Sequence, residues 1–554
     1  MSKQTTKTTH DAIIIGAGVC GIYMLHKLLE MGLDATVVDA AERPGGTWNK
    51  NRYPGARFDS ESYTYAFSFN EEIMQEWDWS EHFAGQPETL RYLTYVVDKL
   101  GIRDHMQFNR TVTAARYDEI NYCWHVEFAD GQKASCRYLC TAIGLLSAPT
   151  KPRYEGLSSF EGESFHTYEW PEGLDYRNKR VAVIGTGATG VQIISEIADK
   201  VADLKVFQRR PNWCAPLKNS KIEDQAALKA WYPEMLEKMG QTLSGFVHSP
   251  ILIASNELPL EEREAVWEEL YDQPGFGIWL GNYYDILLDE DANRDFSDFI
   301  ARKIRQRVSD PATAEKLIPK DHGFGTRRVP LETRYFEAYN HAHVELIELD
   351  ETPIERITPA GIKTSEQDFE FDIIVYATGF DAITGAFDHI DFVGRGGEKL
   401  RDKWDGDPLT YMGLQIVGFP NLFTLAGPQS ASVGSNFPPA IQSVVEWTTE
   451  LVGHLEKNNI VGCEPTVVAE QTWQAEVKMG YDKTLLGNTK SWFTGYNSNV
   501  DGLDKYRHMV YFNGAPKFRE RLGNESEHGY PGFRMESATP QSRHCNEDAP
   551  AEAL

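Results

Sequence analysis

The hydrophobic positions of residues 11–40 predict a strand, a helix and a second strand. The segment DAIIIGAGVCGIYMLHKLLEMGLDATVVDA starts with an apolar run, passes a glycine-rich turn, continues with apolar residues at helical spacing and ends on another apolar run. Short apolar runs are typical of buried parallel strands, and the helical period indicates a helix that covers them. Together they form the pattern of one βαβ unit.

The same plan returns in residues 179–210, KRVAVIGTGATGVQIISEIADKVADLKVFQRR, with Gly185 in the place of Gly16. This duplication predicts two α/β domains of one kind. Between about 222 and 322, charged segments at helical spacing predict a helical insertion, with Asp310-Pro311 as a helix start. Strand patterns resume at HVELIEL (343–349) and FDIIVYATGF (371–380).

Composition narrows the possible partners. The formal net charge is −27, from 55 basic and 82 acidic residues, which argues against a nucleic acid or an anionic membrane as partner. The seven cysteines are scattered without a Cys-x-x-Cys pair, so reduced thiols are expected. The polar N-terminus and the lack of a long apolar run predict a cytoplasmic protein. Nothing in the sequence indicates an oligomeric state.

The first glycine turn carries Gly16, Gly18 and Gly21, between a predicted strand and a predicted helix. In this context the first glycine permits the tight turn, the second lets the backbone approach a pyrophosphate, and the third lets the helix pack on the strand. Asp39 stands at the end of the strand that follows this helix, where an acid can accept hydrogen bonds from ribose hydroxyls. The turn therefore predicts a dinucleotide site.

The second turn carries Gly185, Gly187 and Gly190, but a base, Arg209, stands at the end of the strand that follows it. A carboxylate would repel a 2′-phosphate, whereas a guanidinium would bind it. We therefore expect FAD in the first site and NADPH in the second, with Arg210 adding charge beside the phosphate. The alternative is that the two arginines form a solvated basic patch. The predicted fold is α/β, with two Rossmann-like dinucleotide-binding domains and a helical insertion.

Two longer motifs resemble the signatures of type I Baeyer–Villiger monooxygenases. FEGESFHTYEWP (160–171) matches one signature, and GGTWNKNRYPGARFD (45–59) matches the second. The Trp-Pro ending separates this family from related flavin N- and S-monooxygenases. The first signature contributes these positions: Phe160, Gly162, His166, Trp170 and Pro171.

The resemblance implies an enzyme that uses FAD, NADPH and dioxygen to convert a ketone, expected to be cyclic, to an ester or lactone through a flavin C4a-peroxide. Sulfoxidation is expected as a side activity. Such chemistry needs a fixed cation, and arginine remains charged in a dry site. Arg328, in GTRRVP, matches the family's catalytic arginine, and Asp59 is expected to orient it. His166 is expected to act as a hinge between the domains, not as a general base.

Further positions match functional positions of the family. Ser432, Val433 and Phe437 match the substrate-pocket segment, although each residue would also suit a core. No metal site is expected, because His341 and His343 lack a third ligand. The remaining matches to cofactor-binding positions are Gly46, Thr47, Trp48, Arg57, Asp59, Tyr65, Val112, Thr186, Gly187, Thr189, Gly190, Gln192, Arg327, Arg328 and Trp492.

The chain also departs from the family. Lys50 stands where an aromatic residue is usual, Asp39 replaces the commoner glutamate, and Arg210 replaces Ser or Thr. Three alternatives remain open at this point. They are a flavin N- or S-monooxygenase, an NADPH oxidase or flavin redox sensor, and a nucleotide-binding scaffold without catalysis.

The expected domains follow from these motifs. The FAD-binding domain is expected at 11–150 and 386–523, and the NADPH-binding domain at 151–221 and 323–385. The helical insertion is expected at 222–322. Residues 1–10 and 524–554 are polar and lack periodicity, so flexible ends are expected there.

Overall fold

The computed structural model describes residues 8–431 and 434–538. Its largest sheet has the strand order β17-β4-β5-β6-β1-β2-β3, with β18 also paired to β6. The strands of this sheet are β1 (Thr9–Ile15), β2 (Ala35–Val38), β3 (Met106–Gln107), β4 (Val112–Asp118), β5 (Cys123–Phe128), β6 (Lys133–Thr141), β17 (Asp391–Val393) and β18 (Leu422–Thr424). It thus combines strands from two distant parts of the chain, as a domain built from two segments requires.

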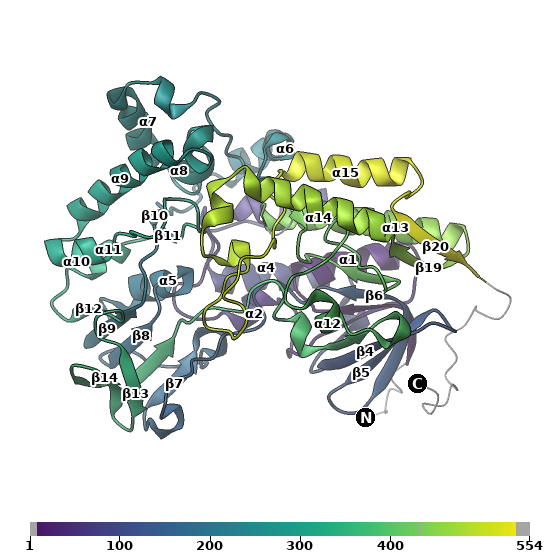
Figure 1. The fold of residues 1–554 in the computed structure, drawn as a ribbon, viewed down its shortest axis with the longest axis horizontal. Coiled ribbons are helices and arrows are strands. Elements are labelled where there is room, and N and C mark those ends of the chain that lie inside the picture. The colour runs from purple at the N-terminus through teal and green to yellow at the C-terminus, as the bar shows by residue number, and fades with distance from the viewer. Residues whose placement is uncertain (1–7, 432–433, 539–554) are drawn as a thin grey trace.

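A second, five-stranded sheet has the order β12-β9-β8-β16-β7, and all its pairings are parallel. Its strands are β7 (Glu163–His166), β8 (Arg180–Ile184), β9 (Asp203–Gln208), β12 (Val344–Glu348) and β16 (Ile373–Tyr376). The two sheets lie in separate lobes, on the right and left of Figure 1. The duplicated βαβ units therefore occupy different lobes, as the sequence pattern predicts.

Helices cover both lobes. Helix α1 (Val19–Glu30) follows the first glycine turn, and α5 (Ala188–Ile197) follows the second. Helix α13 (Phe437–Lys457) packs on α1, and α15 (Ala515–Glu527) packs on α13. The other helices of the two lobes are α2 (Thr47–Lys50), α3 (Glu71–Glu76), α4 (Gln86–Lys99), α11 (Tyr335–Ala338), α12 (Leu400–Trp404) and α14 (Val467–Asp482).

The predicted insertion is helical, and in Figure 1 its helices extend from the centre of the view, beside α15, across the top of the left lobe to its left edge. They are α6 (Gln225–Gln241), α7 (Leu260–Asp272), α8 (Gly277–Leu280), α9 (Glu290–Arg307) and α10 (Pro311–Lys316). Asp310 caps α10 by accepting a hydrogen bond from the Thr313 N–H, as the Asp-Pro signal predicts. Small sheets complete the fold: β10 (Ala215–Pro216) with β11 (Leu331–Glu332), β13 (Ile354–Thr358) with β14 (Gly361–Thr364) and β15 (Asp368–Glu370), and β19 (Ile460–Pro465) with β20 (Phe533–Ser537).

The predicted flexible C-terminal segment, 524–554, is wrong over its first half. Helix α15 runs to Glu527, and β20 pairs with β19 in antiparallel register. The Tyr-Pro-Gly stretch before β20 is a turn between these two elements. The partner strand β19 lies far earlier in the chain, before α14 and α15, so the sequence near 533 contains no sign of it. At the other end, the predicted flexible segment 1–10 is wrong at Thr9, where β1 begins.

Among the described residues, no helix combines the length and the apolar character needed to cross a membrane.

Candidate active site

A cavity of about 1190 Å³ lies where both glycine turns and the helical insertion meet. Its wall includes most of the residues that the sequence analysis assigns to cofactor or substrate. Those residues are Gly16, Gly18, Asp39, Gly46, Thr47, Trp48, Arg57, Asp59, Tyr65, Val112, Gly187, Thr189, Gln192, Arg328, Phe437 and Trp492. Lys50, the residue at the usual aromatic position, also lines the cavity.

The first glycine turn is closed by the rest of the protein. Gly16 has φ +112°, and a Cβ there would lie 2.3 Å from the carbonyl oxygen of Ala142 at the end of β6. A Cβ on Gly21 would lie 1.8 Å from the Gly16 oxygen, so the helix can approach the turn only without a side chain. Gly46, with φ +51°, comes so close that its Cβ would be 2.9 Å from the Cα of Gly18. The second signature thus covers the first turn.

The second glycine turn repeats this geometry but remains open. Gly185 has φ +110°, and its Cβ would lie 2.4 Å from the carbonyl oxygen of Ala377, after β16. A Cβ on Gly190 would lie 2.2 Å from the Gly185 oxygen. At Gly187, however, a Cβ would meet no described atom within 4 Å. Space for a pyrophosphate therefore remains directly over this turn.

Asp39 does more within the protein than the sequence predicts. Its two carboxylate oxygens accept hydrogen bonds from the N–H groups of Ala17 (2.6 Å) and Ala41 (2.7 Å). A carboxylate has about four acceptor positions, so two remain for ribose hydroxyls. Asp39 therefore fixes the glycine turn while it faces the cavity.

Arg328 and Asp59 form an ion pair in the cavity wall. Arg328 Nη1 lies 3.0 Å from Asp59 Oδ2, and the Asp59 side chain is 1% exposed against 34% for Arg328. The contact expected from the sequence is thus present. Burial raises the pKa of Asp59, while the adjacent guanidinium and the N–H of Leu331 lower it. Asp59 holds the cation from behind and leaves part of the guanidinium free toward the cavity.

A second connection between the lobes is a set of hydrogen bonds that the sequence does not indicate. The Tyr53 hydroxyl donates a hydrogen bond to Gln192 Oε1 (2.9 Å), and Gln192 Nε2 donates to the Arg57 carbonyl oxygen (3.0 Å). Gly55, with φ +82°, fits against α5, since a Cβ there would lie 2.8 Å from the Gln192 carbonyl oxygen. The segment that carries Asp59 is therefore fastened to the helix of the second turn.

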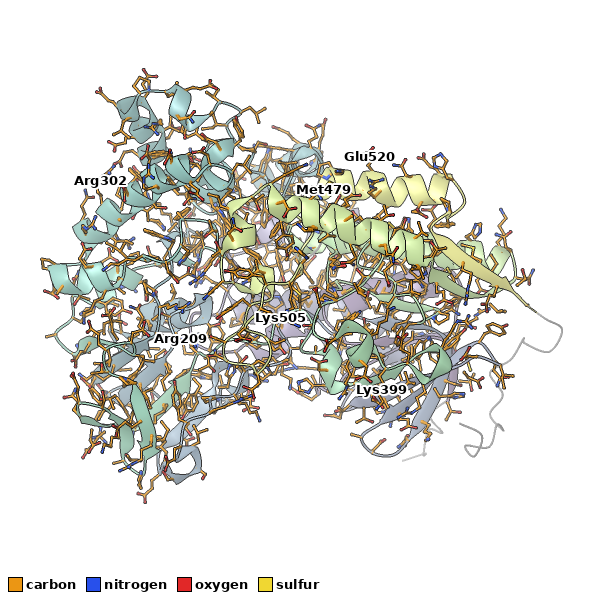
Figure 2. All side chains as sticks on the ribbon, viewed as in Figure 1. Arg209, Arg302, Lys399, Met479, Lys505 and Glu520 are labelled. Carbon is orange, nitrogen blue, oxygen red and sulfur yellow. The ribbon has the colours of Figure 1, made fainter. Side chains whose placement is uncertain are left out.

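Basic side chains gather beyond the second turn. Arg209 is exposed and donates to Asn499 Oδ1 at 2.8 Å (Figure 2). Arg327 donates to Asp321 Oδ2 at 3.0 Å, and Arg210 lies 3.7 Å from the same oxygen. Burial lowers the pKa of Arg327, and the neighbouring arginines lower it further. No sequence motif singles out Asp321, the counter-ion that makes this concentration of charge possible.

These basic residues lie outside the cavity wall, as do Gly21, Thr186 and Gly190. Thr186 instead donates a hydrogen bond to the Arg210 carbonyl oxygen (3.0 Å), which ties the glycine turn to the end of β9. The two glycines serve the packing of helix on strand described above.

An aromatic group borders the first site. Trp48 Nε1 donates to the Tyr65 hydroxyl at 3.2 Å, and Phe58 stacks on Tyr65 with ring centroids 4.5 Å apart. Trp48 meets Phe58 edge-on at 5.5 Å. These contacts fix the orientation of the three rings. Thr47 and Val112 also line the cavity.

The first signature connects the end of β7 to the segment that follows β16 in the second sheet. His166 Nδ1 accepts a hydrogen bond from the Tyr168 N–H (3.1 Å), so Nε2 carries the proton and donates to the Gly379 oxygen (3.0 Å). Burial lowers the pKa of His166. Trp170 packs edge-on against Phe165 at 5.0 Å. Both ring nitrogens of His166 are engaged, which supports a structural role over proton transfer.

Other positions of this signature have steric roles. A Cβ on Gly162 would lie 2.5 Å from the Asp372 carbonyl oxygen and 2.6 Å from the Phe160 ring. Pro171 follows the buried Trp170. The signature thus packs tightly against the end of the strand pair β7–β16.

The aromatic stretch 273–288 contributes to the cavity wall. The sequence leaves open whether it forms a pocket or a core. Phe276, Trp279, Tyr283 and Tyr284 all line the cavity, together with Phe437 at the start of α13. Ser432 and Val433 lie outside the described residues, so their predicted place in the pocket stays a prediction.

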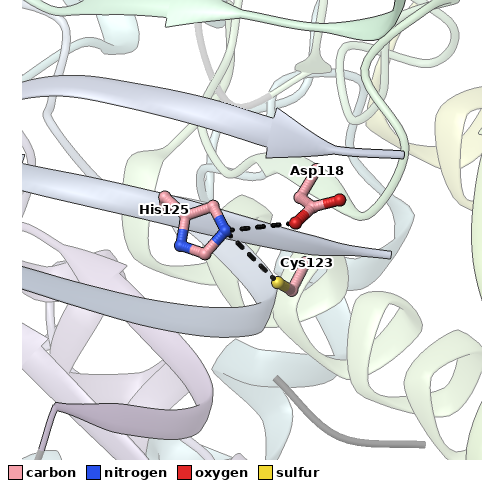
Figure 3. A group of neighbouring side chains, drawn as sticks. All are labelled: Asp118, Cys123 and His125. Carbon is pink, nitrogen blue, oxygen red and sulfur yellow. Dashed lines mark hydrogen bonds and ion pairs between the residues drawn. The ribbon is translucent and has the colours of Figure 1, made fainter. Parts of the chain in front are cut away.

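A group formed by Asp118, Cys123 and His125 lies at the β4–β5 hairpin, away from this cavity (Figure 3). His125 Nε2 is 3.4 Å from Asp118 Oδ2 and 4.0 Å from Cys123 Sγ. The Asp118 carboxylate also accepts hydrogen bonds from the N–H groups of Ile120 and Asn121, at 2.9 and 3.0 Å, and from the Asn121 amide at 2.8 Å. This network closes the hairpin, which accounts for the group without a metal ion.

Comparisons with known proteins agree with this architecture. Residues 13–250 match the family model described as pyridine nucleotide-disulphide oxidoreductase. The chain is 44% identical to 2-oxo-Δ3-4,5,5-trimethylcyclopentenylacetyl-CoA monooxygenase of Pseudomonas putida, over 97% of this chain and 100% of that protein. It is 39% identical to the phenazine N-monooxygenase PhzNO1 of Lysobacter antibioticus, over 96% and 98%. The crystal structure of OTEMO in complex with FAD and NADP superposes with a TM-score of 0.92, at 43% identity, over 96% of this chain and 100% of that one.

Two sheets, each with a glycine turn between a parallel strand and a covering helix, define a protein that binds two dinucleotides. The chain belongs to the family of Baeyer–Villiger monooxygenases.

Proposed function

We propose that this chain uses NADPH and dioxygen to convert a ketone, preferably a cyclic ketone, to an ester or lactone. The observation that carries the proposal is the Arg328–Asp59 pair in the cavity wall, at 3.0 Å. Negative charge develops on oxygen during such an insertion, and a fixed cation in a cavity with little water stabilises it. Arginine suits this role because it does not lose its proton.

The glycine turns and the charged residues beside them fit the two dinucleotides. At Gly16 and Gly185 a side chain would clash with the protein, so each turn stays compact and the N-terminus of the helix that follows it suits a pyrophosphate. Asp39 suits the ribose of FAD, and the arginines at 209, 210 and 327 suit the 2′-phosphate of NADPH. FAD, when bound, supplies the redox chemistry and the activation of dioxygen. The segments 11–150 and 386–523 would hold FAD, with NADPH on 151–221 and 323–385.

The protein's own contribution is position and charge. Arg328 binds oxygen atoms that become negative, and Asp59 keeps the guanidinium in one orientation through a charge-assisted bond. Phe276, Trp279 and Phe437 line the cavity, and their apolar surfaces exclude water from the reacting atoms. Trp492, also in the wall, would close over the nicotinamide nucleotide.

Oxidation at nitrogen or sulfur is the second candidate, because a relative 39% identical to this chain is named a phenazine N-monooxygenase. Oxygen transfer to a soft heteroatom places less demand on a fixed cation than insertion beside a carbonyl does. The Arg328 guanidinium, held by the buried Asp59 carboxylate, therefore favours the ketone.

The test is a panel of cyclic ketones, thioethers and phenazines, with NADPH consumption and product mass measured together. We expect ketone-dependent NADPH consumption and a product heavier by one oxygen atom that hydrolyses as an ester. NADPH consumption that no ketone accelerates, with hydrogen peroxide as the product, would contradict the proposal. Heteroatom oxides with no lactone from any ketone would favour the second candidate.

A further inference from the structure

The cavity wall formed by the insertion is mostly apolar, and its polar members are Ser244, His248, Asn282, Tyr283 and Tyr284. Phe246 and Phe276 contact each other edge-on at 5.4 Å, and Phe276 meets Trp279 at 5.7 Å. His248 stands in this wall between them and Pro250. A polar ring in such a wall must either be satisfied by the protein or meet a polar group of the ligand.

Among the described residues, hydrogen bonding reaches only one edge of the His248 ring. Nε2 lies 2.9 Å from Glu61 Oε1, and the side chains of His248 and Glu61 are 17% and 8% exposed. An ionised carboxylate only accepts hydrogen bonds, so Nε2 carries a proton. The other Glu61 oxygen, Oε2, is buried without a hydrogen-bond partner within the described part of the chain.

Glu61 is itself held firmly. A Cβ on Gly275, which has φ +75°, would lie 2.9 Å from Phe83 and 3.0 Å from Glu61 Oε1, so there is no room for a side chain between this backbone and the carboxylate. Glu61 also stands close after Asp59 on the same segment. One stretch of chain therefore fixes both the cation at Arg328 and the orientation of His248.

The opposite edge of the ring is available. Within residues 8–431 and 434–538, no hydrogen bond is formed by His248 Nδ1, and this atom is not among the buried unpartnered atoms. Gly277 faces it, and a Cβ at that position would already lie 3.6 Å from Nδ1. Position 277 therefore has no side chain to cover this edge of the ring, and the nearest atom to such a Cβ is Gln273 Oε1, at 3.3 Å.

We propose that His248 forms a specificity subsite that binds a hydroxyl group on the ketone substrate, remote from the reacting carbonyl. This inference rests on the proposed ketone oxidation and names its substrate class as hydroxylated ketones. A hydroxyl donates to Nδ1 when the imidazole is neutral and accepts from it when the ring is protonated. A methyl group in the same place would leave Nδ1 desolvated and unpaired, which costs binding. Glu61 is the positioning residue of this subsite.

The test uses the flavin-loaded enzyme and matched pairs of ring-substituted cyclohexanones. Each pair differs only in hydroxyl against methyl, or hydroxymethyl against ethyl, at positions 2, 3 and 4. We expect kcat/KM for at least one hydroxylated member to exceed that of its partner by about tenfold. His248→Leu should reduce this ratio to about one or lower, whereas His248→Gln, whose amide donates and accepts, should restore part of it.

The matched control is His341→Leu, an exposed histidine outside the cavity, which should leave the ratio unchanged. Unsubstituted cyclohexanone separates the two proposals, because its turnover tests the ketone chemistry alone. The subsite is refuted if wild-type enzyme oxidises the ketones but prefers no hydroxylated member. It is also refuted if His248→Leu retains the wild-type ratio while its flavin content and cyclohexanone turnover are normal.

Glu61→Gln tests the positioning role separately. The amide oxygen still accepts from Nε2 but without charge, so we expect the hydroxyl preference to persist with an altered pH profile. An unchanged pH profile would show that the carboxylate does not influence the ring.

Discussion

The two glycine turns of this protein have nearly the same backbone but different surroundings. Both begin with a glycine whose φ is strongly positive, +112° and +110°, and a Cβ added there would lie 2.3 Å from a carbonyl oxygen in one turn and 2.4 Å in the other. Over the first turn lies Gly46 of the second signature, whereas nothing described lies within 4 Å of a Cβ on Gly187. The acid beside the first turn is tied to two backbone N–H groups, and the arginine beside the second is exposed.

This difference matches two kinds of ligand. A site that the protein covers suits a cofactor that remains through many catalytic cycles. A site open on one side suits a nucleotide that must enter and leave. The same βαβ unit therefore serves both purposes, and the segments added around it decide which one.

The largest effect is expected at the pair that links the two halves. Arg328→Ala should leave reduction of the flavin by NADPH within a few-fold of wild type, because neither turn is touched. Ester formation should fall by about a thousandfold or more, since the charge on oxygen loses the cation that Asp59 holds in place. Stopped-flow reduction and product analysis on the same preparation measure the two steps. Normal lactone yield from this variant would disprove the role of Arg328.

A matched pair of glycine substitutions tests whether the first glycine turn is tightly covered and the second is open. Gly16→Ala adds a Cβ 2.3 Å from the Ala142 oxygen at φ +112°, so we expect a loss of about 2–4 kcal/mol in unfolding free energy and poor flavin retention. Gly187→Ala meets no described protein atom, so its thermal midpoint should stay within about 2 °C while the KM for NADPH rises. Equal thermal destabilisation by both changes would contradict the comparison.

The smallest effect is expected at the coenzyme's outer phosphate. Arg209→Ala should raise the KM for NADPH by about 10- to 100-fold, because one charge-assisted phosphate contact is lost. The kinetics with NADH, which has no 2′-phosphate, serve as the internal control and should change little. Wild-type enzyme that used both coenzymes equally well would show that Arg209 and Arg210 are an ordinary basic patch.

The sequence is most informative where the physical cause is local. The glycine spacing, the apolar strands and the Asp-Pro start of α10 depend on neighbours along the chain, and each element lies where it is expected. The helical insertion follows in the same way from its charge and period.

Contacts between distant segments are harder to predict from the sequence. Nothing near Tyr53 indicates that it meets Gln192, and nothing near Asp321 indicates that it offsets two arginines. The pairing of Asp59 with Arg328 is expected only from the family resemblance, since the whole second glycine turn and the helical insertion separate them along the chain. The strand at 533–537 is missed for the same reason, because its partner β19 and not its own sequence defines it.

That C-terminal strand has a practical consequence for handling the protein. Phe533–Ser537 forms a two-stranded antiparallel sheet with Ile460–Pro465. An affinity tag, fusion partner or surface linker at this end should therefore begin after residue 538. A junction placed at 524, at the start of the polar region, would remove β20 and leave the backbone groups of β19 unpaired, which invites self-association during purification.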